Sequence, residues 1–148
     1  MSVAALVWYG ARLCLVAMFP FSAIDKLWHW RNSLAQTKSS GLRGGKTMLV
    51  AAILIEGLTP LLIVSGWHDR LGAFLLAGFC VVTAFLYHPF WKGPDFFSQA
   101  DDSKSREHFW QFLKNFGLAG GLALVIFGGA RTPPQEVFDH PLGSSLSR

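Results

Sequence analysis

The stretch ILIEGLTPLLIVSG, residues 53–66, is an almost unbroken apolar run that carries a single carboxylate, Glu56. Such a run is typical of a helix that is buried or crosses a membrane. A carboxylate in apolar surroundings costs free energy unless it is paired or hydrogen-bonded. The run therefore raises two questions, which are what surrounds this segment and what Glu56 contacts.

The rest of the chain has the same apolar character. Of the 148 residues, 51% are hydrophobic and 15% are charged. A helix that spans a bilayer needs about 20 apolar residues, and the stretches of sufficient length are 3–24, 48–66, 71–90 and 109–130. The sequence therefore predicts an all-α fold, an integral membrane four-helix bundle.

These spans define one predicted domain, residues 1–131, without a repeat or a second domain. Residues 132–148 are rich in proline, glycine and serine, which predicts an exposed irregular C-terminal tail. The six tryptophans lie at or near the predicted ends of the spans, where the amphipathic indole favours the headgroup layer.

The orientation in the membrane is predicted from the basic residues. Most of them lie in the connections 25–47 and 91–108, so we expect both connections in the cytoplasm and both termini on the non-cytoplasmic side. This assigns the protein to the bacterial inner membrane as a multi-pass protein. The same distribution explains the net charge of +4 without a nucleic-acid partner.

Two ionisable residues fall inside predicted spans. Glu56 lies eight residues into its span, which places it roughly 12 Å deep, and Arg12 reaches a similar depth in the antiparallel first span. A charge in lipid costs about 3 kcal/mol on insertion scales. We therefore expect an Arg12–Glu56 ion pair, which either locks the first two helices together, or orients a polar ligand or relays protons.

A second polar group is expected at the cytoplasmic ends of the helices, where Lys26 and Lys114 could each snorkel to the headgroups. His88 is more informative, because it ends a long uncharged run and can exchange protons with water. The candidate buried polar or ligand-binding residues are Arg12, Lys26, Glu56, His88 and Asn115.

No self-contained catalytic motif is visible, and metal-binding spacing of the HxxxH or CxxC type is absent. Cys14 and Cys80 lie in separate spans and are expected to be apolar packing residues. A haem would need a second imidazole opposite His88. Only His29 and His108 are available, both predicted nearer the surface, so we expect no haem.

The fourth span contains a glycine pattern. Gly117 and Gly121 form a GxxxG pair, with Gly120 beside them, and small residues at this spacing let another backbone approach closely. The partner could be a helix of this bundle or a second protein chain, and the sequence leaves both open.

With these residues placed, the chain resembles the DoxX family of small four-helix bacterial membrane proteins over about residues 11–129. The resemblance rests on Arg12 with FSAIDKLWHW, on IEGLTPLLIVSGWHDRLGAFLLAGF, on AFLYHPF and on HFWQFLKNFGLAGGLALV. The matching polar and glycine positions are Arg12, Lys26, Glu56, Gly66, Arg70, His88, Asn115, Gly120 and Gly121. Ala23 departs from the glycine that members more often have there.

The resemblance implies a role as an accessory or anchor subunit of a membrane oxidoreductase complex, beside a quinone pool. A quinone is then the implied cofactor, since arginine, glutamate and histidine side chains can hydrogen-bond its oxygens. The partners would be the bilayer and either another protein or further copies of this chain. The alternatives are a small proton-coupled transporter lined by Arg12, Glu56 and His88, and a purely structural scaffold subunit.

Overall fold

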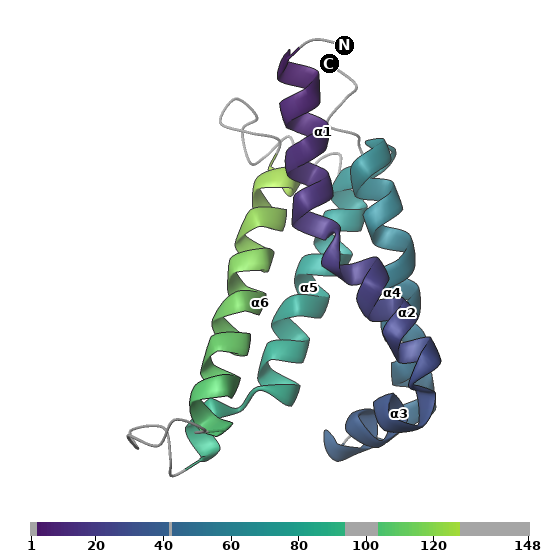
Figure 1. The fold of residues 1–148 in the computed structure, drawn as a ribbon, viewed down its shortest axis with the longest axis vertical. Helices are drawn as coiled ribbons and strands as arrows, with labels where there is room; N and C mark the ends of the chain where they lie inside the picture. Colours follow the sequence, from purple (N-terminus) through teal and green to yellow (C-terminus); the bar gives the residue numbers. More distant parts are fainter. Residues whose placement is uncertain (1–2, 42, 94–103, 128–148) are drawn as a thin grey trace.

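The computed structural model describes residues 3–41, 43–93 and 104–127, and this part of the chain is helical and without strands. The helices run upward and downward in a tilted bundle (Figure 1), and α1 begins at the end where α6 finishes. The elements are α1 (Val3–Val16), α2 (Met18–Trp28), α3 (Trp30–Ser39), α4 (Gly45–Ser65), α5 (Asp69–Tyr87), the short 3-10 turn η1 (Phe90–Lys92) and α6 (Lys104–Ile126).

Four helical units are long and apolar enough to cross a membrane: Ala5–Trp28, Gly45–Ser65, Asp69–Lys92 and Lys104–Ile126. Their outer faces carry large apolar side chains, and Phe21, Leu61, Phe74 and Leu124 are each at least 65% exposed. Apolar faces of this extent are stable against lipid and not against water. The predicted fold class, an all-α membrane bundle, is confirmed, and the protein is a multi-pass membrane protein.

The first unit is kinked where α1 meets α2. Pro20 lies in the first turn of α2 and has no N–H, so the carbonyl of Val16 loses its helical donor and faces the proline ring. The amide of Ala17 still donates to the Leu13 carbonyl at 2.8 Å. The chain therefore bends at Ala17 without forming a loop, and α1 and α2 cross the membrane as one unit.

The region predicted as a connection, residues 25–47, is mostly helical, which corrects the expectation. Helix α2 continues to Trp28, and after His29 the chain turns sharply into α3, which lies across the lower end of the bundle in Figure 1. The loop between α3 and α4 is short. Gly41 and Gly44 adopt φ of 74° and 92° there, a conformation that favours glycine.

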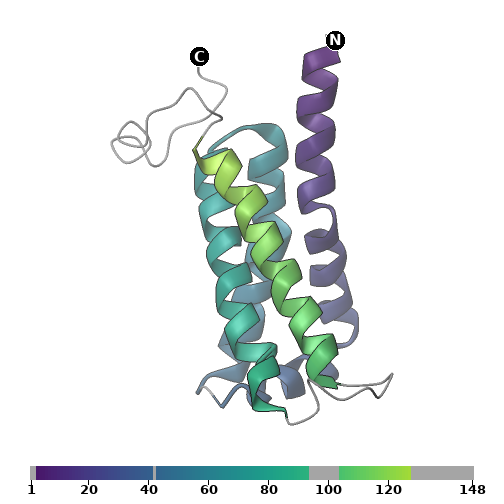
Figure 2. The same cartoon turned by 90° about the vertical axis from the view of Figure 1, so that its left-hand side faces the viewer.

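Helices α4 and α5 form a close antiparallel pair. The turn between them contains Gly66 at φ 74°, and Gly72 lies so near α4 that an added Cβ would be 3.1 Å from the Thr59 carbonyl oxygen. Helix α6 packs along α5 on the other side, as Figure 2 shows with α6 in front. The buried core between the helices consists of Val16, Phe19, Ile63, Ala73, Leu76, Cys80 and Leu122.

The division into one domain at residues 1–131 and a tail at 132–148 stays a prediction. The tail lies outside the described residues, as does most of the 91–108 connection. Within the described part, α6 begins at Lys104, five residues before the predicted start of the fourth span.

Candidate functional site

Glu56 pairs with Lys26. The Lys26 Nζ lies 2.7 Å from Glu56 Oε2 and 3.0 Å from Oε1, which makes the contact bidentate. The Ser22 hydroxyl donates to Glu56 Oε1 at 3.2 Å, and Lys26 Nζ also donates to Ser22 Oγ at 2.6 Å. Ser22 and Lys26 are four residues apart, so α2 presents both on one face. The carboxylate is almost fully buried, with 5% of its side chain exposed.

The predicted Arg12–Glu56 pair is therefore wrong. Arg12 Nη1 lies 2.7 Å from Asp69 Oδ2 and donates to the Ile63 carbonyl at 2.7 Å. Its guanidinium also stacks over the Trp8 ring at 3.8 Å, a cation–π contact. The sequence-based depth assumed that the first span ends at residue 24. Because the helix continues to Trp28, Arg12 lies level with the α4–α5 turn and not with Glu56.

Asp69 was not among the predicted site residues. It is fully buried, and its Oδ1 accepts the backbone N–H of Arg70 at 2.9 Å, as expected for a carboxylate in the first turn of a helix. The position of Asp69 directly after the turn was the feature of the sequence that could have indicated it. Ser22 was missed as well, although its spacing from Lys26 could have indicated it.

Arg70 follows Asp69 in the first turn of α5 and is 5% exposed. Its Nε is buried without a hydrogen-bond partner, the only such side-chain atom among the described residues. The start of α5 thus holds one paired guanidinium, that of Arg12, and a second buried arginine, Arg70, that forms no ion pair among the described residues.

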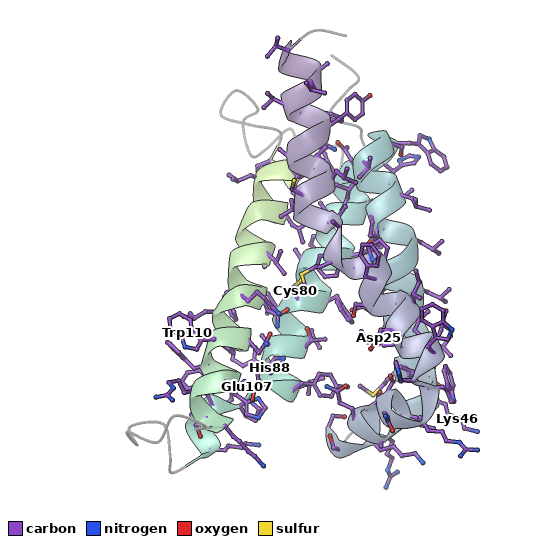
Figure 3. All side chains as sticks on the ribbon, viewed as in Figure 1. Asp25, Lys46, Cys80, His88, Glu107 and Trp110 are labelled. Carbon is purple, nitrogen blue, oxygen red and sulfur yellow. The ribbon has the colours of Figure 1, made fainter. Side chains whose placement is uncertain are left out.

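His88 ends α5 and contacts His108 of α6. Their Nδ1 atoms are 3.3 Å apart, with donor and acceptor set by the tautomers, and the rings are tilted by 46°. The prediction that His108 lies too near the surface to meet His88 is wrong, because α6 begins earlier than expected. Figure 3 shows His88 and Glu107 close together at the lower end, whereas Trp110 points away from the bundle.

A pocket of about 370 Å³ lies between the helices at this end, within the usual range for small-molecule sites. Part of its wall is apolar, with Phe19, Leu49 and Phe79 among the lining residues. Its polar lining residues are Ser22, Lys26, Ser33, Gln36, Thr37, Glu56, Thr83, Tyr87, His88, Gln111, Lys114 and Asn115.

The pocket brings together four of the five predicted polar site residues, namely Lys26, Glu56, His88 and Asn115, and leaves Arg12 outside. The Asn115 amide donates to the Gln111 carbonyl within α6 at 3.0 Å. Helix α3, which the sequence did not predict, adds Ser33, Gln36 and Thr37 to the floor. The result is a mostly apolar cavity that also carries hydrogen-bond donors and acceptors. Such a cavity is able to hold the polar head of a membrane-soluble molecule.

The predicted packing glycines differ in their surroundings. A Cβ on Gly121 would lie 2.8 Å from Leu15 Cδ1, so this glycine lets α1 approach α6 within the bundle. Gly117 and Gly120 have nothing within 4 Å of that position. The pattern therefore serves internal packing at Gly121, and an oligomer contact at the other two stays a prediction.

Comparison with protein families gives a match. The family model described as DoxX matches residues 7–89, more than half of the chain, from α1 to the end of α5. The match includes Arg12, Lys26, Glu56 and His88 and ends before α6. Neither a curated protein nor a solved structure matches the chain.

Proposed function

This chain belongs to the DoxX family, and we propose that it is an accessory or anchor subunit of an inner-membrane oxidoreductase complex. In that role its pocket holds the head of a membrane quinone. The observation that carries the proposal is the Lys26–Glu56 pair in the wall of a pocket between membrane-spanning helices.

The chemistry of the pocket supports a ligand with hydrogen-bond acceptors on a ring. The amides of Gln111 and Asn115 line the pocket as donors, Glu56 is an acceptor for a hydroxyl group, and Lys26 supplies a positive charge beside it. Charge-assisted hydrogen bonds are the strongest of these contacts. The apolar part of the wall suits a hydrocarbon ring. These features support binding of a quinone.

The test is purification in mild detergent followed by native mass spectrometry and solvent extraction. We expect stoichiometric quinone with the wild-type protein and at least tenfold less with Lys26→Met/Glu56→Leu, which removes both charges together. The matched control is Lys46→Met, which removes an exposed lysine at the start of α4, outside the pocket. A wild-type protein that elutes as a clean monomer, with neither quinone nor a partner protein, would refute the proposal.

A proton-coupled transporter is the second candidate, because two titratable groups, Glu56 and His88, line one pocket and His88 contacts His108. Reconstituted vesicles distinguish the two functions. Transport predicts pH-dependent solute uptake that Glu56→Gln abolishes. Unchanged vesicle pH and solute content favour the subunit role, and a scaffold would show neither transport nor quinone.

A further inference from the structure

Packed helix pairs form most of the side wall of the pocket. Helix α4 packs against α2, α3 and α5, and α5 packs against α6, so each of these neighbouring pairs forms a continuous wall. Among the described helices, α2 and α6 form no comparable contact with each other. Both nevertheless line the pocket, α2 through Met18 and Ser22 and α6 through Gln111 and Lys114.

The opening between α2 and α6 has a defined upper limit. Helices α1 and α6 touch where Gly121 faces Leu15, at a distance that leaves no space for a Cβ. One turn lower on α6, Gly117 has open space. Below this contact α6 and the kinked α2 diverge toward the end where α3 lies, as Figure 1 shows.

The opening lies along membrane-spanning segments. It falls within the units Ala5–Trp28 and Lys104–Ile126, whose outer faces are apolar. Lipid chains and molecules dissolved among them therefore reach it directly.

The size of the pocket restricts how a ligand can lie in it. About 370 Å³ is near the lower limit for small-molecule sites. A ring-sized head fits, and a long hydrocarbon chain must leave the cavity. Placing the hydrocarbon chain against the polar floor is unfavourable because its apolar surface would not be buried among apolar groups. The opening between α2 and α6 instead leads the hydrocarbon chain into lipid.

We infer that the ligand is a long-chain amphiphile that enters sideways from the bilayer through the opening between α2 and α6. Its head contacts Lys26 and Glu56, and its chain passes below the Leu15–Gly121 contact into the surrounding lipid. This inference rests on the proposed function for the chemistry of the head and goes beyond it in assigning the route and the chain.

The test closes the opening with a bifunctional methanethiosulfonate linker. Met18→Cys and Gly117→Cys are placed on α2 and α6, each about one turn below the Leu15–Gly121 contact, in a Cys14→Ala/Cys80→Ala background. The control pair is Leu61→Cys/Phe74→Cys, which links the exposed faces of the packed helices α4 and α5. The probe is decyl-substituted benzoquinone, and native mass spectrometry counts the bound molecules.

We expect the linked Met18→Cys/Gly117→Cys protein to bind at least tenfold less quinone than the unlinked protein when the linker is added first. When the quinone is added first, it stays bound through washing. The linked control pair binds like its unlinked form. Equal binding before and after linking across α2 and α6 would overturn the inference while leaving the quinone function intact.

A second measurement tests the route without a quinone. A bimane dye on Thr83→Cys, in the pocket wall, is quenched in vesicles by lipids with brominated chains if such chains reach the opening. We expect quenching that the α2–α6 linker reduces severalfold and the control linker leaves unchanged. Quenching of this kind without quinone binding refutes the proposed function alone, and no effect of the linker on quenching refutes the lateral route.

Discussion

At the residue scale, two buried carboxylates are each matched by a cation from the first membrane unit. Glu56 binds Lys26 and Asp69 binds Arg12, one pair near the middle of α4 and the other at the start of α5. An isolated charge in this setting costs several kcal/mol, whereas a paired and hydrogen-bonded one is tolerated. The pairs therefore fix α1 and α2 against the α4–α5 hairpin at two levels.

The Lys26–Glu56 pair predicts an unequal effect of single and double substitutions. Glu56→Leu alone leaves the Lys26 ammonium without its carboxylate and should lower the free energy of unfolding by about 3 kcal/mol. Lys26→Met/Glu56→Leu removes both charges and should lie within about 1 kcal/mol of wild type. A detergent melt followed by reaction of the buried Cys80 thiol, in a Cys14→Ala background, measures both. Equal losses in the two variants would contradict the pairing.

The two buried arginines, Arg12 and Arg70, are predicted to contribute unequally to stability. Arg12→Met removes the ion pair, the bond to the Ile63 carbonyl and the contact with Trp8, and should cost about 3 kcal/mol. Arg70→Met removes a guanidinium whose Nε has no partner and should change stability by less than about 1 kcal/mol. The same melt measures both, and a greater loss from Arg70→Met would contradict this assignment.

The sequence located the ionisable residues inside the spans but did not predict their partners. An acid in an apolar run and an arginine in a span are conspicuous because their cost is local and can be read from the chain. Their partners depend on the kink at Ala17 and on where the first unit ends, which shift Arg12 relative to Glu56. Asp69 was missed because it follows a turn, where a carboxylate has no apparent cost.

At the scale of elements, the α4–α5 hairpin depends on a close approach of two backbones. A Cβ at Gly72 would lie 3.0 Å from Leu62 Cβ and 3.1 Å from the Thr59 carbonyl oxygen, atoms that cannot move without shifting α4. Small residues at such positions allow membrane helices to pack closely. The hairpin in turn places Glu56 of α4 and His88 of α5 around the same pocket.

Gly72→Ala is therefore expected to destabilise the protein by about 1–3 kcal/mol through overpacking. The matched control is Gly78→Ala in the same helix, where nothing lies within 4 Å. There the added methyl group should be neutral or stabilise by up to about 1 kcal/mol through helix propensity. In a thermal melt, a lower melting temperature for Gly78→Ala than for Gly72→Ala would contradict this close packing of α4 against α5.

The spans themselves were predictable to within a few residues. Span 48–66 corresponds to α4 at Gly45–Ser65, because lipid requires a length of apolar sequence that hydropathy reveals. Helix α3 was not predicted, since its sequence is polar and its buried residues, Ser33 and Thr37, give no apolar period. Its position depends on the turn at His29, which is a tertiary feature.

At the scale of the whole molecule, the two ends differ in exposed charge. The end near α3 and η1 presents exposed cations from several elements, including Arg31, Lys38, Lys46, Lys92 and Lys104. At the other end, the arginines of the described residues, Arg12 and Arg70, are buried at 6% and 5% exposure. Buried arginines present no charge to the membrane surface. In the described part of the chain, the two ends therefore differ more in exposed positive charge than a count of basic residues indicates.

This asymmetry predicts that the α3 end faces the cytoplasm, because exposed lysine and arginine near short loops are retained on that side. Ser39→Cys at the end of α3 and Trp67→Cys in the α4–α5 turn place exposed thiols at opposite ends, in a Cys14→Ala/Cys80→Ala background. A membrane-impermeant maleimide should label the Trp67→Cys variant in spheroplasts and the Ser39→Cys variant only after lysis. The reverse pattern would place the pocket floor, with His88 and His108, outside the cytoplasm, and any proton leaving the pocket by that route would then be released on the opposite side of the membrane.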